Sequence, residues 1–208
     1  MIFAFNEQDD YYSYISYFYP EGQHALSAGI FLKLGYGHIA LPFSRIQEAK
    51  QVLIHELTHN CLFGLRIPIW LNEGLSQRME QTVGPGGLRP RNVVLDRELA
   101  AEHHAFWTEQ NIQEFWAGTS FYRPGDGNKL SYSLGEILVE VLSGQWGDFL
   151  DFVEHADPRD GGQDAALKFL DRCLGDAVGG FLGPGEWRPN RKKITELRER
   201  QRKEQTGD

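Results

Sequence analysis

Two histidines and a glutamate in the segment His55-Glu-Leu-Thr-His59 have the residue types and the spacing of a metal site. If the segment is helical, residues four apart lie on the same face, so His55 and His59 could direct imidazole nitrogens to one ion. Glu56 stands next to that face and could accept a proton from a water molecule near the ion. The spacing therefore predicts metal-assisted hydrolysis with Glu56 as the general base.

A catalytic zinc site needs a third protein ligand and an open coordination position for water. The candidate third ligand is Glu73, in a segment from Trp70 onward that is expected to form a second helix. Gly64 and Pro68 interrupt the chain between the two helices, and an antiparallel return would bring Glu73 beside His59. Two imidazoles and one carboxylate suit Zn²⁺, which makes zinc the expected cofactor.

The combination of His55-Glu-Leu-Thr-His59 with Asn72-Glu73-Gly74 resembles the gluzincin zinc metallopeptidases, which include thermolysin-like and aminopeptidase-N-like enzymes. The resemblance implies a zincin-like fold, zinc held by the two histidines and Glu73, and a peptide or protein substrate. In the aminopeptidase-like branch a second glutamate follows the ligand by seven residues, and Glu80 has that position. A Tyr-x-x-Gly element further along supplies a tyrosine to the oxyanion, and Tyr132-Ser-Leu-Gly135 matches it.

By this resemblance, Glu80 would orient a histidine ligand and Tyr132 would stabilise the oxyanion. Two features differ from the aminopeptidase-like branch. The interval between His59 and Glu73 is shorter, and the Gly-x-Met-Glu-Asn strand that holds a free amino terminus is absent, with Gly37–Leu41 in its place. Recognition of a free amino terminus is therefore not expected. The layout is similar to that of small gluzincin-like domains of bacteria.

Each of these residues also has a simpler interpretation. The histidines could belong to the polar face of an amphipathic helix, and Glu73 could be a first-turn residue favoured by the helix dipole. Tyr132 could be a core aromatic, with Tyr122 as the alternative oxyanion donor. The competing functions are a zinc-bound module that binds peptides or proteins without turnover, and a metallohydrolase of a non-peptide amide. Glu56 argues against the first, because a structural zinc site usually closes all four positions with protein ligands.

Other reactive residues give weaker signals. His103 and His104 are adjacent, so on a helix they point in different directions, and one buried and one exposed histidine are expected. Cys61 is expected to be a small core residue. Ser133 has no nearby base in the sequence that would make it a nucleophile.

The elements that must position the metal residues follow an α+β order, with a small N-terminal sheet before a mainly helical part. A strand is expected at 2–5, a helix at 7–19, and an antiparallel hairpin of strands 28–34 and 38–41 joined by Gly35-Tyr-Gly37. Strand 38–41 is expected to pair with an extended substrate. Ser44 and Gln47 would cap the histidine helix, with a core face formed by Ile46, Ala49, Leu53 and Leu57. Further helices are expected at 70–81, 97–110, 131–142, 145–155 and 163–174, with a break at 84–87.

Composition sets limits on the class of protein. The chain has 208 residues, with 41% hydrophobic and 24% charged residues, as in an ordinary globular protein. We expect one zincin-like domain at 1–187 and a charged tail or helix at 188–208. The net charge of -8 argues against nucleic acid as a partner, and two cysteines exclude a disulfide framework. The sequence contains no membrane-spanning apolar run and no signal-like start, so a cytoplasmic location is expected.

Overall fold

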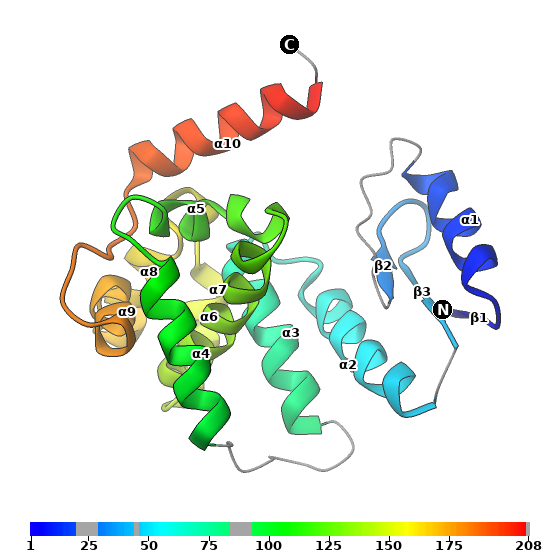
Figure 1. Ribbon diagram of the computed structural model, residues 1–208, viewed down its shortest axis with the longest axis horizontal. Helices are drawn as coiled ribbons and strands as arrows, with labels where there is room; N and C mark the ends of the chain where they lie inside the picture. The colour runs from blue at the N-terminus through cyan, green and yellow to red at the C-terminus, as the bar shows by residue number, and fades with distance from the viewer. Residues whose placement is uncertain (20–28, 44–45, 84–92, 207–208) are drawn as a thin grey trace. The chain divides into compact units, whose positions relative to one another are not determined.

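The computed structural model describes residues 1–19, 29–43, 46–83 and 93–206 (Figure 1). The chain forms two compact units. The first contains Met1–Gly64 and Ser76–Arg89, and the second contains Leu65–Leu75 and Pro90–Asp208. A small sheet precedes a mainly helical part, which confirms the expected α+β class.

The sheet of the first unit has three strands, β1 (Ile2–Phe5), β2 (Ile30–Leu32) and β3 (His38–Pro42). Strands β2 and β3 form the expected antiparallel hairpin, with Leu32 opposite His38. Its turn contains Gly35 with φ +75, a value that glycine adopts without strain. Strand β1 runs parallel to β3 on the other side, with Ile2 opposite Ile39, so the strand order is β1-β3-β2.

Two helices cover the sheet, α1 (Gln8–Phe18) and α2 (Ile46–Leu62), and Figure 1 shows one on each side of it. Alternate strand residues point to opposite faces, as the period of a strand requires. On the α1 side the buried cluster contains Tyr11, Ile15, Leu32 and Ala40. On the α2 side the cluster contains Phe31, Ile39 and Leu41, with Val52 and Leu53 packed against it. The histidine helix is therefore fixed by its packing on the sheet.

The expected core face of α2 is only partly correct. Leu53 packs toward the sheet, but Leu57 is 40% exposed, because it lies on the other side of the helix from the sheet. The expected cap at Ser44 and Gln47, the side chains of Ile46 and Ala49, and the break at 84–87 lie outside the described residues.

The helical part begins with α3 (Ile69–Val83), whose first half belongs to the second unit and whose second half belongs to the first. The elements that follow are α4 (Val93–Phe106), α5 (Ile112–Ala117), η1 (Thr119–Tyr122), α6 (Asp126–Leu142), α7 (Trp146–His155), η2 (Pro158–Asp160), α8 (Gln163–Leu170), α9 (Leu174–Leu182) and α10 (Arg191–Thr206). Among the described residues, none of these helices combines the length and apolar character needed to cross a membrane.

Two expected helices end earlier than their patterns suggest. Helix α4 ends at Phe106, and the backbone N–H groups of Thr108 and Asn111 each donate to the other residue's side-chain oxygen, at 2.7 and 3.2 Å, which closes a loop there. Helix α8 ends before Asp171, which adopts φ +48, and α9 starts as a separate helix. Local hydrogen bonds and backbone geometry therefore end these two helices, although the spacing of apolar residues alone would extend them further.

Buried tryptophans hold the second unit together. The indole N–H of Trp70, at the start of α3, donates to the Gly161 carbonyl at 2.9 Å. The indole N–H of Trp116 donates to the Trp187 carbonyl at 2.8 Å. Both rings are fully buried and contact each other edge-on, with centroids 5.7 Å apart. Trp70 thus anchors the helical turn that carries Glu73.

Helix α10 packs on α5 despite its many charges. Ile194 is fully buried, and Arg198 Nε donates to the Ala117 carbonyl at 2.9 Å, at the end of α5. Burial of this guanidinium lowers the pKa of Arg198.

Candidate metal centre

His55, His59 and Glu73 form a group that could hold a metal ion. One ligand atom from each side chain lies within 4.8 Å of the other two, and all three side chains are partly buried. The histidines come from α2 and the glutamate from the first half of α3. The two imidazole rings have centroids 4.7 Å apart and an interplanar angle of 79°. These are the three residues that the motif spacing predicts.

The Nδ1 atom of each histidine faces a polar side chain of α3. His55 Nδ1 lies 3.4 Å from Glu80 Oε2, and His59 Nδ1 lies 3.2 Å from Ser76 Oγ. A carboxylate oxygen accepts a hydrogen bond, so this contact favours the proton on Nδ1 of His55 and leaves its Nε2 lone pair for a metal. The resemblance assigns Glu80 an orienting role, and His55 is the histidine that Glu80 contacts.

Ser76 was not identified from the sequence as part of this site. It is fully buried and lies one helical turn after Glu73, on the face that also carries Glu80. The sequence contains a signal for it: Ser76 follows Glu73 by three residues and precedes Glu80 by four, and residues at these spacings share a helix face.

Glu56 is a buried carboxylate, with only 8% of the residue exposed. It follows His55 directly on α2, three residues after Leu53, which packs against the sheet. Atom Oε2 of Glu73 is also shielded from solvent. Carboxylates of this kind are rarely buried unless they are paired or coordinate a metal.

Helices α3 and α6 approach each other very closely at two glycines. A Cβ atom on Gly74 would lie 2.4 Å from the Gly135 carbonyl oxygen, and one on Gly135 would lie 2.8 Å from the Trp70 oxygen. The Asn-Glu-Gly and Tyr-x-x-Gly segments therefore meet through their glycines. On α6, Tyr132 precedes Gly135 by about one helical turn. On α3, Glu73 is the residue directly before Gly74.

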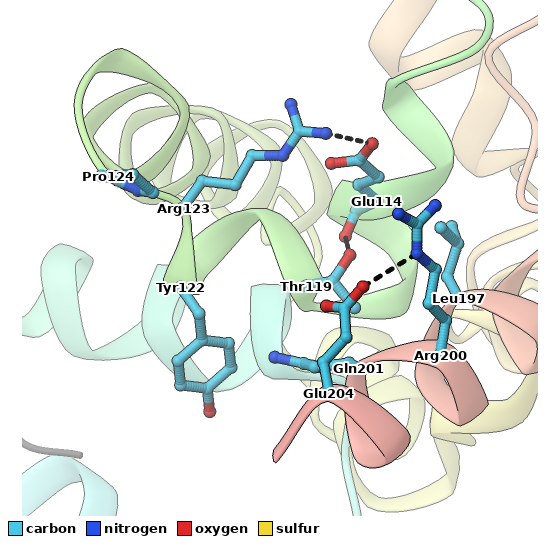
Figure 2. A pocket seen from close by; sticks show the side chains of 9 residues that line it. All are labelled: Glu114, Thr119, Tyr122, Arg123, Pro124, Leu197, Arg200, Gln201 and Glu204. Atoms are coloured by element: carbon cyan, nitrogen blue, oxygen red, sulfur yellow. Dashed lines mark hydrogen bonds and ion pairs between the residues drawn. The ribbon is translucent and has the colours of Figure 1, made fainter. Parts of the chain in front are cut away.

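Tyr132 is partly buried and contacts Phe121 edge-on, with ring centroids 5.2 Å apart. The alternative oxyanion donor, Tyr122, is 66% exposed and borders a different, polar pocket of about 290 Å³ in the second unit. Figure 2 shows this pocket between η1 and α10, with ion pairs Arg123–Glu114 and Arg200–Glu204 in its wall. None of the metal-group residues lines it.

The prediction that strand 38–41 pairs with a substrate is wrong. Strand β3, which contains residues 38–41, has β1 on one side and β2 on the other, so its backbone groups are already used. In the sheet that the described residues form, the edge strands are β1 and β2, and α2 packs against β2 and β3. Strand β2 is therefore the edge beside the histidine helix.

Cys61 is exposed and not a core residue, because it follows Leu57 on the outer side of α2. By contrast, the expected pair of one buried and one exposed histidine is confirmed, since His103 is fully buried and His104 is exposed.

The structure brings His103 to Ser133, which had no apparent base in the sequence. His103 Nε2 lies 3.0 Å from Ser133 Oγ, and the indole N–H of Trp107 donates to His103 Nδ1 at 2.9 Å. Because indole can only donate, Nδ1 is the acceptor and the neutral ring carries its proton on Nε2. His103 therefore donates to Ser133 and cannot serve as its base, so these two residues do not form a nucleophilic dyad.

The buried His103 should make the protein sensitive to acid. Burial lowers the pKa of His103 to about 4, against a smaller opposing effect of Glu102. The unfolded chain, with an ordinary histidine pKa near 6.5, binds the proton first, so stability is fully present above about pH 6.5 and falls as the pH drops toward 4. The loss should reach about 3 kcal/mol. The free energy of unfolding, measured with urea between pH 4 and 7, should depend less on pH in His103→Gln than in the wild type. In His104→Gln it should have the wild-type pH dependence. Equal slopes in all three proteins would contradict this assignment.

Comparison with known protein families, with curated proteins and with solved structures gives no match for this chain. The likeness to gluzincins consequently rests on the residues of the metal group and their neighbours.

Proposed function

We propose that this protein is a zinc-dependent peptidase of gluzincin type. The observation that carries the proposal is the convergence of His55, His59 and Glu73, whose ligand atoms lie within 4.8 Å of one another. Two imidazoles and a carboxylate match the ligand set of a catalytic zinc site that keeps one position open. The contact of Glu80 with His55 Nδ1 and the hydrogen bond between Ser76 and His59 Nδ1 add the outer contacts that such a site needs.

In this proposal each residue of the site has a separate role in hydrolysis. When bound, zinc would polarise the scissile carbonyl and lower the pKa of water in its open position. Glu56 accepts a proton from the attacking water and passes it to the leaving amine. The hydroxyl of Tyr132 donates a hydrogen bond to the developing oxyanion, a contribution typically worth about 3–4 kcal/mol. Glu80 and Ser76 keep the imidazole rings in position.

The substrate is proposed to lie along β2, the edge of the sheet beside α2. The outer strand of a sheet can form backbone hydrogen bonds with an extended peptide. Such pairing is made with the peptide backbone, which supports a peptide substrate in preference to a non-peptide amide.

Metal analysis tests the central proposal. Purified protein should contain about one zinc per chain, as one three-ligand site implies. His55→Ala, His59→Ala and Glu73→Ala should each lose it, because two remaining ligands hold zinc poorly. His104→Gln is the matched control, and it should keep the metal because His104 is exposed and lies outside the group. A folded wild-type protein that binds no zinc from a buffered solution would exclude the proposed site.

A non-catalytic zinc module is the competing function. It would bind zinc equally well but would show no chelator-sensitive cleavage of a mixed peptide library. The buried carboxylate of Glu56 favours the peptidase over the non-catalytic module. Glu56 is a potential general base that is next to His55 in the sequence but is not one of the three metal-group residues.

A further inference from the structure

An exposed aromatic ring continues the line of the two histidines on α2. Phe63 follows His59 by four residues, as His59 follows His55, and its backbone N–H contacts the Asn60 carbonyl at 3.3 Å in the turn that ends the helix. Residues at this spacing share a helix face, and Phe63 lies one residue past the end of α2. Phe63 is 54% exposed, so a large apolar surface stands open one turn beyond a metal-group histidine.

Strand β2 supplies the surroundings of this ring. Phe31 contacts Phe63 edge-on, with centroids 5.8 Å apart and an interplanar angle of 78°. The Nζ atom of Lys33 lies 5.7 Å from the centroid of the Phe63 ring. A Cβ atom on Gly37 would lie 3.0 Å from the Phe31 ring, so glycine leaves the room that this ring occupies. We call Phe31, Lys33 and Phe63 the Phe63 platform.

The direction of the chain orients this platform relative to the histidines. Gly37 precedes β3 and lies near Asn60, close to the C-terminal end of α2, whereas the other end of β3 is joined by a short connection to the start of α2. Helix α2 is therefore antiparallel to β3 and runs in the same direction as β2. A peptide antiparallel to β2 would pass the platform first and the histidines afterwards.

We propose that the Phe63 platform is a side-chain subsite for an extended peptide, a proposal that rests on the proposed peptidase function. The platform takes an aromatic or large aliphatic side chain about two residues before the scissile bond. Phe63 follows His59 by four residues, and four residues of a helix advance about 6 Å. This distance is close to the length of two residues of an extended peptide. Antiparallel pairing is chosen because it is the slightly more stable arrangement.

The chemistry of the platform specifies the rest of the substrate. The half-covered Phe63 ring gains burial when an apolar side chain lies on it. Lys33 is exposed at the same place and favours an acidic residue next to that side chain. The preferred sequence is thus a large apolar residue flanked by Asp or Glu, on the amino-terminal side of the cleaved bond.

A mixed library of amino-acetylated peptides, digested and read by mass spectrometry, tests this assignment. In Phe63→Ala, kcat/KM should fall about tenfold for peptides with Phe or Leu at the proposed position and change little for those with Ala there. Phe63→Leu should keep most of the preference. Lys33→Glu should shift the neighbouring preference from acidic to basic residues. Tyr17→Ala, which removes an 84% exposed aromatic on α1, is the matched control and should leave the profile unchanged.

Zinc content, measured in parallel, shows that each variant keeps its fold and metal. Cleavage by Phe63→Ala with the wild-type profile would overturn the subsite while leaving the peptidase function standing. A preference located after the scissile bond would overturn the antiparallel orientation. A zinc-loaded wild type that cleaves no peptide would overturn the peptidase function and the subsite together.

Discussion

Replacing Glu56 by glutamine is expected to lower kcat of the proposed peptidase reaction about a thousandfold without loss of the proposed zinc. The amide has nearly the shape of the carboxylate but cannot accept the proton of the attacking water, and a positioned general base contributes roughly 10²- to 10⁴-fold to a rate. Zinc should remain, because Glu56 lies outside the group of His55, His59 and Glu73. The measurement is steady-state hydrolysis of a fluorogenic peptide together with elemental analysis of the same sample.

The matched control is Glu80→Gln, the same chemical change at a carboxylate that faces His55 Nδ1. This variant should lose zinc affinity about 10- to 100-fold, while kcat of the zinc-saturated enzyme changes much less than in Glu56→Gln. The two variants thus separate proton transfer from orientation of the imidazole. Full activity in Glu56→Gln would show that the proposed base is wrong.

Replacing Gly74 by alanine should destabilise the protein by about 3 kcal/mol, near the upper end of the usual cost of overpacking. The new Cβ would stand 2.4 Å from the oxygen and 2.6 Å from the carbon of the Gly135 carbonyl. Both are backbone atoms, so α3 and α6 must separate. The midpoint of thermal unfolding should fall by roughly 10 °C. Zinc affinity should fall as well, because the displaced turn carries Glu73.

Gly180→Ala provides the comparison for this experiment. Gly180 lies within α9, and a Cβ atom there would meet nothing within 4 Å. Alanine should therefore stabilise the helix by about 0.5–1 kcal/mol, through the lower entropy of its backbone. Opposite signs for the two substitutions would show that close helix packing, and not a general intolerance of alanine, explains the effect at Gly74. Unchanged stability in Gly74→Ala would contradict the close crossing.

Local patterns predicted the elements that carry the candidate site. The four-residue interval between His55 and His59, and the glycines at the hairpin turn, are signals within a few residues of one another, and the helix and the hairpin both form. The approach of Glu73 to the histidines was predictable for a related reason, because only a short loop separates α2 from α3.

Pairings between distant segments were not predictable in the same way. Four apolar residues at the start of the chain indicate a strand, but nothing in Ile2–Phe5 specifies that β3 is its partner, and this pairing turns β3 into a central strand. The contact of His103 with Ser133 joins residues 30 apart on different helices. Helix α10 has so many charges that Ile194, the one fully buried residue among those of the helix whose side chains are described, gives little periodic signal.

The path of the chain through its two units limits how the protein can be divided. The first unit is built from Met1–Gly64 and Ser76–Arg89, and the segment between them, Leu65–Leu75, belongs to the second. Both units are therefore discontinuous in sequence, and no single cut releases either one whole. During synthesis, the first unit cannot be completed until α3 has emerged, by which time part of the second unit is already present. A cut at any single point in the chain therefore divides at least one of the two units.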